Sequence, residues 1–526
     1  MNAPTQARPA IPGGPQSAAA VLDAGLASHP EREALVGRHG RYTWTHLDAE
    51  ANRAARALTA LGVGGGDRVA MALPNDVDIV VGFLACMRLG AVWLGISLAL
   101  APPEKTYMVE DSDASILLTT PEIVASIRSP ARVIAVDPAG TADEWRALVA
   151  SADDARLDTE VDPFAPAAIA YTSGTTGLPK GVVHSQHNLL LPGAVARARA
   201  QYTVDDRIGV VLPLTLVNLI ALGPLLAWQG GTTCVAIDRI DAPGLAGWIR
   251  DERVTAVSTV PTIMHDLLTH PEVAPADLET LRKPGVGGAD CPESFRDLYR
   301  RTFGAEVTVG YGLTEAPTAV TMTEPERPAV PGSAGRALPH VRIAICGPDG
   351  TELGPGEVGE ICVGPATGGA WADVYTPMLG YWGRPAETAE AIHDGMLHTG
   401  DLGSIDANGE LFVRDRRHDL IIRGGANVYP AEVERVLHDD SRVAACAVVG
   451  RPDERLGERV VAFVEPVEGS HFDADELLAH CRVNLAAYKV PEEILFVDRF
   501  ERTAMGKIVK TDLRRRLRSG GGRTAL

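Results

Sequence analysis

A short apolar run that leads into a loop of small and hydroxyl residues constrains this chain more than any other feature. The run is Ala167–Tyr171, and the loop Thr172–Lys180 reads Thr-Ser-Gly-Thr-Thr-Gly-Leu-Pro-Lys. Glycines let backbone N–H groups approach an anion, hydroxyls add donors, and lysine adds a positive charge. A P-loop ends in Gly-Lys-Ser/Thr, whereas here Pro179 precedes the lysine and Gly181 follows it. The sequence predicts a buried strand and a phosphate-binding loop of another kind; an idle surface loop is the weaker alternative.

Length and charge limit the classes of protein to which the chain can belong. Its 526 residues are more than one hydrophobic core normally holds, so we expect at least two domains. The formal net charge of −19 argues against nucleic acid or an anionic membrane as a main partner. Seven scattered cysteines without a Cys-x-x-Cys pair fit a reducing compartment, and the N-terminus lacks the pattern of a signal peptide. We therefore expect a cytoplasmic protein.

The uncharged stretch Ile208–Ile237 is long enough to span a membrane. It contains Pro213, Pro224 and a Gly230-Gly231 pair, which interrupt a spanning helix. We predict a strand, a helix and a second strand there, and no integral membrane segment.

Alternating strands and helices between about residues 20 and 400 predict open, mostly parallel sheets. Strands are expected at 68–73, 91–96, 115–118, 132–136, 167–171 and 307–309, and a helix at 76–89. The pattern then changes to short strands at 341–345, 359–363 and 410–413, with the hairpin signal Asn408-Gly409 before the last. This region predicts a small β-barrel that closes a large α/β domain.

After residue 416 the chain restarts as a compact α+β unit. Strands are expected at 418–422, 443–449 and 460–464, and helices at 430–438, 473–481 and 510–518. Asp473 is the expected N-cap of the second helix. We divide the chain into a disordered tail (1–17), a large N-terminal domain (18–415) and a small, mobile C-terminal domain (416–526).

Four further motifs carry side chains suited to a nucleotide. Gly310–Glu315 offers the flat ring of Tyr311 to a base and the Glu315 carboxylate to magnesium. His398–Gly403 places Asp401 at a tight turn, where a carboxylate can accept two ribose hydroxyls; stabilisation of its own turn is the alternative. Two basic residues complete the set: Arg416 in a charged run that is otherwise a linker, and Lys507 in a loop where a lysine is usually only solvated.

In their order and spacing, these motifs resemble the adenylate-forming superfamily of acyl-CoA synthetases, firefly luciferase and peptide-synthetase adenylation domains. The resemblance covers about residues 20 to 515 and is closest to acyl-CoA ligases of fatty, alicyclic or aryl acids. It implies that a carboxylate attacks the α-phosphate of MgATP, and that a thiol then displaces AMP from the acyl-adenylate. ATP, Mg²⁺ and CoA would be the cofactors.

The resemblance also implies roles for individual residues. Lys507, Glu315 and Thr175 would be catalytic, with Glu315 and Thr175 also holding Mg²⁺. ATP or AMP would be bound by Thr172, Ser173, Gly174, Thr176, Gly177, Lys180, Tyr311, Gly312, Thr314, Asp401 and Arg416. Gly424 and Gly425 would let the CoA arm pass close to the backbone. The hinge between the domains would be His418, where the family more often has aspartate or lysine.

A second departure from the family concerns the acyl pocket. Related synthetases often have Leu-Pro-Leu-Phe-His, and here Leu216 stands where the histidine would be. The pocket would be more apolar at that point, with Asn218 as a deeper polar contact and Gly287, Gly288 and Ala289 as another wall. A medium-chain, alicyclic or aryl carboxylate fits such a pocket. The alternative is that Leu216 merely packs in a core.

Several functions remain open at this level. We expect a free-standing acyl-CoA synthetase, because no carrier-protein or condensation domain is evident beside the motifs. A stand-alone enzyme that loads a carrier-protein phosphopantetheine thiol is the main alternative, since both acceptors present the same thiol. A non-enzymatic binding module is disfavoured by Lys507, Glu315 and Asp401. A zinc site at His184 and His187 lacks enough neighbouring ligands. The acid, the pathway and the oligomeric state stay undetermined.

Overall fold

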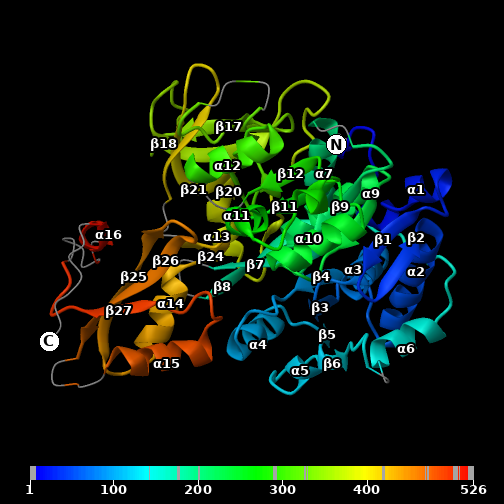
Figure 1. Cartoon of the computed structure of the whole chain (residues 1–526), viewed down its shortest axis with the longest axis horizontal. Coiled ribbons are helices and arrows are strands. Elements are labelled where there is room, and N and C mark those ends of the chain that lie inside the picture. The colour runs from blue at the N-terminus through cyan, green and yellow to red at the C-terminus, as the bar shows by residue number, and fades with distance from the viewer. Residues whose placement is uncertain are drawn as a thin grey trace, which may run out of the picture.

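In the computed structural model, two mostly parallel sheets and the helices that connect their strands form most of the chain before residue 340 (Figure 1). The structure describes residues 8–140, 143–173, 178–199, 202–287, 293–324, 327, 330–416, 421–467, 470, 473–501, 508 and 510–518. The six-stranded sheet has the order β12-β11-β9-β10-β1-β2, with β1 (Glu33–Gly37), β2 (Gly40–Thr43), β9 (Arg207–Val210), β10 (Thr233–Ala236), β11 (Ala256–Thr259) and β12 (Lys283–Val286). The seven-stranded sheet has the order β19-β8-β7-β4-β3-β5-β6, with β3 (Arg68–Ala72), β4 (Val92–Gly95), β5 (Ile116–Thr119), β6 (Arg132–Ala135), β7 (Pro166–Ser173), β8 (Pro179–Ser185) and β19 (Gly380–Tyr381).

Helices connect these strands, as the alternation in the sequence predicts. They are α1 (Asp23–Ser28), α2 (Trp44–Ala60), α3 (Val77–Leu89), α4 (Pro102–Asp111), α5 (Pro121–Val124), α6 (Glu144–Ser151), α7 (Gln186–Arg199), α8 (Val217–Ile220), α9 (Leu226–Gln229), α10 (Ala242–Asp251), α11 (Pro261–Thr269) and α12 (Glu293–Phe303). The uncharged stretch 208–237 forms the predicted strand, helical segment and strand. In the described part of the chain, we find no helix with the length and apolar character needed to cross a membrane.

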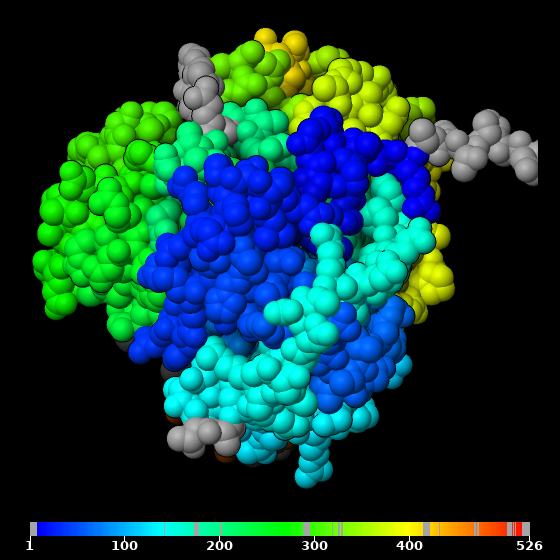
Figure 2. All heavy atoms as spheres, turned by 90° about the vertical axis from the view of Figure 1, so that its right-hand side faces the viewer, coloured from blue at the N-terminus to red at the C-terminus, as the bar shows by residue number. Residues whose placement is uncertain are grey.

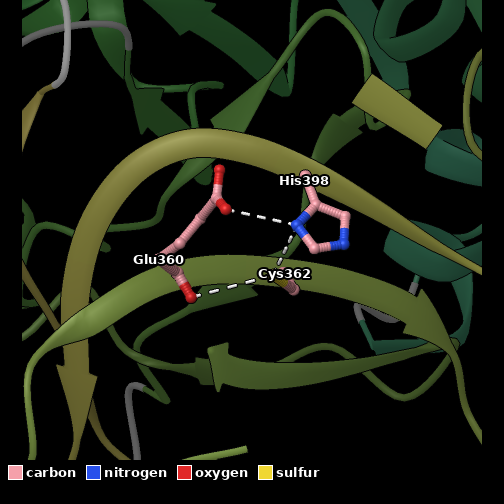
Figure 3. A group of neighbouring side chains, drawn as sticks. All are labelled: Glu360, Cys362 and His398. Atoms are coloured by element: carbon pink, nitrogen blue, oxygen red, sulfur yellow. Dashed lines mark hydrogen bonds and ion pairs between the residues drawn. The ribbon is translucent and has the colours of Figure 1, made fainter. Parts of the chain in front are cut away.

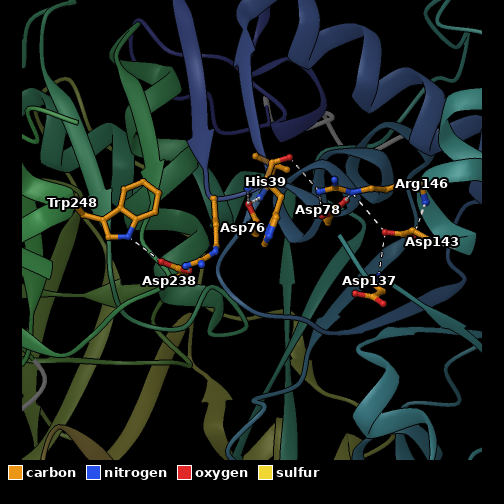
Figure 4. A network of polar contacts seen from close by, with 10 residues as sticks. His39, Asp76, Asp78, Asp137, Asp143, Arg146, Asp238 and Trp248 are labelled. Carbon is orange, nitrogen blue, oxygen red and sulfur yellow. Dashed lines mark hydrogen bonds and ion pairs between the residues drawn. The ribbon is translucent and has the colours of Figure 1, made fainter. Parts of the chain in front are cut away.

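Helix α3 illustrates how local sequence and packing agree. The Asp76 carboxylate accepts the N–H of Val77 at 2.8 Å as the N-cap, and Gly90 ends the helix with a φ of +67°. All its residues are buried between neighbouring elements. Asp76 also lies 2.5 Å from His39 Nδ1, and Arg146 donates to Asp78 at 2.6 Å, so polar contacts join the start of α3 to the turn between β1 and β2 and to α6 (Figure 4).

The segment that follows α6 packs on the outside of α2. Asn52 Nδ2 donates to the Asp154 carbonyl at 2.9 Å, and Arg53 pairs with the Asp154 carboxylate at 2.6 Å. In the side view this segment crosses the N-terminal helices as a cyan band over blue (Figure 2). It leads the chain from the outer surface back to β7, the strand that carries the phosphate-binding loop.

An antiparallel sheet stands where the sequence predicts a small β-barrel. It contains β17 (Val341–Cys346), β18 (Gly359–Pro365), β20 (Ile392–His393), β21 (Met396–Ile405) and β22 (Leu411–Arg416), in the order β17-β18-β21-β20 with β22 paired to β21. The predicted hairpin at Asn408-Gly409 is present: Gly409 has a φ of +84° and its N–H donates to Asp406 O at 3.0 Å.

One predicted strand is wrong. Residues 307–309 belong to no ladder, although their sequence is apolar and β-branched. The Val309 N–H donates to Thr323 Oγ1 at 2.8 Å, and the Val309 carbonyl accepts the Thr323 N–H at 2.7 Å. A side-chain hydroxyl therefore supplies one of the contacts that a neighbouring strand would supply in a sheet.

The C-terminal part forms a separate α+β unit. Its elements are β23 (Ile421–Arg423), β24 (Ala426–Val428), α14 (Pro430–His438), β25 (Val443–Asp453), β26 (Gly457–Pro466), α15 (Ala474–Asn484), β27 (Glu493–Phe496) and α16 (Lys510–Arg518). Asp473 caps α15 as predicted, accepting the Glu476 N–H at 2.9 Å. Each described hydrophobic core consists either of residues before 414 or of residues after 420. This separation is what two domains require.

Candidate active site

The two strands that flank the phosphate-binding loop form an antiparallel hairpin. Thr172 in β7 pairs with Lys180 in β8, and Ser173 pairs with Pro179, so the loop begins and ends at one point. The Tyr107 hydroxyl donates to the Pro179 carbonyl at 3.0 Å and anchors this end of the hairpin to α4. Gly174, Thr175, Thr176 and Gly177, together with the side chain of Ser173, lie outside the described residues.

Lys180 and Glu315 both contact Tyr381. Lys180 Nζ lies 5.1 Å from the centre of the Tyr381 ring, and the Tyr381 hydroxyl donates to Glu315 Oε1 at 3.0 Å. Burial raises the pKa of Glu315; the charge of Asp401 adds to this increase and that of Lys180 opposes it. The predicted phosphate-binding lysine and the predicted magnesium ligand therefore share one polar cluster with Asp401. Tyr381 was not predicted from the sequence, because its place depends on the pairing of β19 with β8.

Tyr311 is hydrogen-bonded to Asp401. Its hydroxyl donates to Asp401 Oδ2 at 2.6 Å, and its N–H donates to Thr321 Oγ1 at 2.9 Å, which fixes the ring and backbone together. Asp401 in β21 pairs with Arg416 in β22, so the backbone brings the two predicted ribose residues side by side. The described part of Arg416 is its backbone. Gly312 begins the short strand β13 (Gly312–Leu313), and Thr314 lies in the turn between that strand and Glu315.

The predicted acyl-pocket segments leave the same edge of the six-stranded sheet. Strands β9, β11 and β12 are parallel neighbours, so the loop after β9, Val260 after β11 and Gly287 after β12 lie at one edge. Leu216, in the loop after β9, exposes 47% of its surface. This exposure contradicts the alternative that Leu216 merely packs in a core. Gly288 and Ala289 lie outside the described residues.

The seven-stranded sheet approaches this edge of the six-stranded sheet at Gly95. A Cβ atom placed on Gly95 would lie 2.0 Å from the carbonyl oxygen of Thr215, so the end of β4 and the loop after β9 are in backbone contact. Two buried polar atoms of this segment, Thr215 Oγ1 and Asn218 Oδ1, have no hydrogen-bond partner. Such atoms are costly unless something satisfies them, and a bound molecule is one candidate.

The C-terminal domain places its glycine turn at the same edge. Gly424 and Gly425, with φ of +58° and +81°, connect β23 to β24. A Cβ atom on Gly425 would lie 2.1 Å from Val260 Cγ1, whereas one on Gly424 would first meet Leu456 Cδ2 at 3.6 Å. The predicted CoA-binding turn therefore contacts the residue that follows β11. Val260 is another contact that sequence reasoning did not identify.

A buried charge cluster joins the two domains. Lys489 Nζ lies 2.6 Å from Glu104 Oε1 and 2.8 Å from Glu432 Oε1, and all three side chains are buried. Glu104, at the start of α4, also accepts the Ala486 N–H at 2.9 Å. Burial lowers the pKa of Lys489, but the two carboxylates outweigh burial and raise it, so the lysine stays charged.

Other predicted residues have simpler placements. His418 and Lys507 lie outside the described residues. His184 and His187 are buried, and His187 Nε2 lies 2.8 Å from the Val374 carbonyl oxygen. His187 therefore makes a structural contact with the backbone.

Two family models match the chain. The model described as AMP-binding enzyme covers residues 22–382, and the model described as AMP-binding enzyme C-terminal domain covers residues 432–507. The chain is 38% identical over 507 residues to a feruloyl-CoA synthase from Amycolatopsis sp, covering 94% of this chain and 99% of that one. It is 35% identical to the indoleacetate–CoA ligase of Aromatoleum aromaticum, covering 94% and 96%. A structure of o-succinylbenzoate CoA synthetase from Bacillus subtilis superposes with a TM-score of 0.81 at 30% identity, covering 94% and 98%.

Proposed function

The chain belongs to the AMP-binding enzyme family as an AMP-forming acyl-CoA ligase, and we propose that it joins an aryl-substituted carboxylate to free CoA in two steps driven by ATP. Two contacts carry this proposal. Lys180 and Glu315 both contact Tyr381 beside the hairpin, and the Gly424–Gly425 turn contacts Val260 at the carboxyl edge of the six-stranded sheet.

In the first step, a substrate carboxylate oxygen attacks the α-phosphorus of ATP, and the bond to the β-phosphate oxygen breaks to release pyrophosphate. The Thr172–Lys180 loop and the Lys180 ammonium would hold the departing phosphates. Asp401 would accept ribose hydroxyls while the Tyr311 hydroxyl holds its other oxygen, and Tyr311 would face the base. Lys507 would neutralise the charge that develops at the α-phosphate.

Mg²⁺ fits the residues around Glu315. A partly buried carboxylate whose pKa is raised by desolvation gains stability from a nearby cation, and carboxylate oxygens are ligands that magnesium prefers. Glu315, together with Thr175, would hold the ion. When bound, Mg²⁺ would offset the negative charge of the phosphates.

In the second step, the CoA thiol attacks the acyl carbon of the adenylate and AMP leaves with its bonding electrons. The Gly424–Gly425 turn, which has no side chains, would let the pantetheine arm run along the backbone beside Val260. We propose that the described domain arrangement is the one that serves thiol transfer, with residues 18–415 and 416–526 as its two domains and His418 at the hinge.

The proposed substrate class rests on the pocket and on the relatives. Leu216 presents an apolar surface, and Asn218 Oδ1 and Thr215 Oγ1 are buried acceptors that suit a hydroxyl or N–H substituent. Two relatives are named for aryl-substituted acids, feruloyl and indoleacetate. We therefore favour an aryl acid with such a substituent over a medium-chain or alicyclic one.

The test is product analysis with a panel of aryl, alicyclic and medium-chain acids, MgATP, and either free CoA or a phosphopantetheine-loaded carrier protein. We expect AMP, pyrophosphate and a new thioester mass with an aryl acid and free CoA. Thioester formation on the carrier protein alone would show that the acceptor is the carrier protein and not free CoA. Turnover restricted to aliphatic acids would overturn the substrate class, and failure to form adenylate with any acid would overturn the ligase assignment of the site residues.

A further inference from the structure

A cluster of metal-binding side chains lies on the antiparallel sheet, away from the proposed phosphate and acyl contacts. Glu360 and Cys362 are two residues apart on β18, and Cys362 is paired with His398 on the adjacent strand β21. All three side chains point toward one another between the strands (Figure 3). Among the residues that the structure describes, they are the one group of three or more metal-binding side chains whose donor atoms all lie within 4.8 Å of one another.

The distances match those between ligands of a single small cation. Cys362 Sγ lies 3.4 Å from His398 Nδ1, and the same nitrogen lies 3.2 Å from Glu360 Oε2. Tetrahedral zinc has bonds of about 2.0 to 2.3 Å, which separate its sulfur, nitrogen and oxygen ligands by about 3.3 to 3.6 Å. Both distances from His398 Nδ1 are within about 0.2 Å of these values, and the Cys362 sulfur and the Glu360 carboxylate lie within 4.8 Å of each other.

A cation also resolves a competition at the imidazole. His398 Nδ1 has a single bonding direction, yet it faces both the Cys362 sulfur and the Glu360 carboxylate. A hydrogen bond at this nitrogen joins it to one of these partners, and Cys362 Sγ also lies 3.8 Å from the Glu360 carbonyl oxygen, whereas a metal ion in the centre contacts all three side chains. The ligand types select among metals, because a thiolate with an imidazole and a carboxylate suits zinc and disfavours magnesium.

Surrounding contacts hold the ligands in place. The Gly400 N–H donates to Glu360 Oε1 at 2.9 Å, which turns the other carboxylate oxygen toward His398. The His393 ring stacks on His398 with a centroid distance of 3.6 Å and an angle of 11° between the planes. Cys362 is completely buried, while the side chains of Glu360 and His398 are 24% and 12% exposed. Such support around the ligands is typical of metal sites, and the partial exposure leaves a path for entry.

We propose that Glu360, Cys362 and His398 form a binding site for one zinc-like transition-metal ion. The site would join β18 to the part of β21 that carries Asp401, since His398 and Asp401 are three residues apart on that strand. Metal binding would stabilise this part of the sheet. This inference does not depend on which acid the enzyme activates.

The test uses the full-length, tag-free chain, stripped with a chelator and titrated with Co²⁺ as a spectroscopic probe. We expect one equivalent to bind, with a thiolate-to-cobalt charge-transfer band and tetrahedral d–d bands that Zn²⁺ then displaces. Absence of the charge-transfer band in the wild-type chain would overturn the proposal by itself, without any variant.

Variants assign the ligands. Cys362→Ala should abolish the charge-transfer band, and His398→Gln should weaken Co²⁺ binding at least tenfold. Cys86→Ala is the matched control, because it removes a buried thiol from α3, outside the cluster, and should leave the band unchanged. If Cys362→Ala does not fold, His398→Gln decides. A band that survives in Cys362→Ala, or disappears in Cys86→Ala, would contradict the assignment.

Discussion

At the scale of single residues, the glycine turn of the C-terminal domain offers two positions that differ in one respect. Both Gly424 and Gly425 have a positive φ, so alanine strains the backbone at either position. A new Cβ meets Val260 Cγ1 at 2.1 Å only from Gly425. The difference between the two alanine variants therefore measures the domain contact, because the backbone strain is common to both.

We expect Gly425→Ala to slow thiol transfer by about 10- to 100-fold, because displacement of a reacting group by about 1 Å costs that much. Formation of the adenylate should change much less. Single-turnover measurements of pyrophosphate release and of thioester formation separate the steps. Equal losses in Gly424→Ala would show that strain, and not the contact with Val260, causes the defect.

Tyr311→Phe removes the hydroxyl that donates to Asp401 Oδ2 at 2.6 Å. A hydrogen bond to a charged group contributes about 1.5 to 3 kcal/mol, so we expect KM for ATP to rise about tenfold or more if Asp401 binds the ribose. The ring stays, so kcat should fall less. Steady-state kinetics at varied ATP check this, and an unchanged KM would separate Tyr311 and Asp401 from nucleotide binding.

The buried side chain of His340 leads to a prediction about how the stability of the protein depends on pH. Burial lowers the pKa of this imidazole to about 4, and its ring packs against that of Tyr375 with an angle of 69° between the planes. Between about pH 6.5 and pH 4 the unfolded chain binds a proton that the folded chain does not, so stability falls as pH decreases through this window. The loss amounts to roughly 3 kcal/mol at the acid end.

The variant His340→Phe should remove that part of the pH dependence. Urea denaturation between pH 4.5 and 7 should give a shallower dependence of the unfolding free energy on pH than in the wild-type chain. If the two slopes are the same, folding does not lower the pKa of His340.

At the scale of elements, the contact between α4 and the C-terminal domain rests on Lys489. The lysine lies between Glu104 and Glu432, and removal of the cation leaves two buried carboxylates uncompensated. We expect Lys489→Met to lower the unfolding free energy by about 3 to 5 kcal/mol and to weaken domain docking. Chemical denaturation measures the first effect, and the ratio of thioester formation to adenylate formation measures the second.

Arg455→Met is the control. Arg455 also joins the C-terminal domain to the large domain, through Asp266 in α11 at 3.5 Å, but this ion pair is exposed. A pair of this kind contributes at most about 1 kcal/mol. Similar losses in both variants would mean that burial does not distinguish the two bridges.

At the scale of the whole molecule, none of the hydrophobic cores formed by the described residues contains residues from both sides of the segment 414–420. A chain ending at residue 416 should therefore unfold cooperatively and bind a non-hydrolysable acyl-adenylate analogue. It should form little thioester, because it lacks Lys507 and the glycine turn. Calorimetry and ligand-induced shifts in Tm check this, and a truncated chain without a cooperative transition would contradict independent folding of the large domain.

Local signals predicted much of this fold correctly. The cap at Asp473, the turn at Gly409 and the bounds of α14 and α16 depend on neighbouring residues, so the sequence determined them by itself. The same holds for the strand before the phosphate-binding loop. The expected strand at 307–309 failed because an apolar, β-branched run meets Thr323 instead of a ladder partner.

Only the tertiary structure decided which distant residues meet. Tyr381 reaches Glu315 through the pairing of β19 with β8, Val260 meets Gly425 across the domains, and Lys489 finds Glu104 far along the chain. None of these pairs has a local signature, because each depends on strand order or on domain docking. The motifs thus determined the family and the chemistry, while the contacts that position their side chains required the assembled sheets.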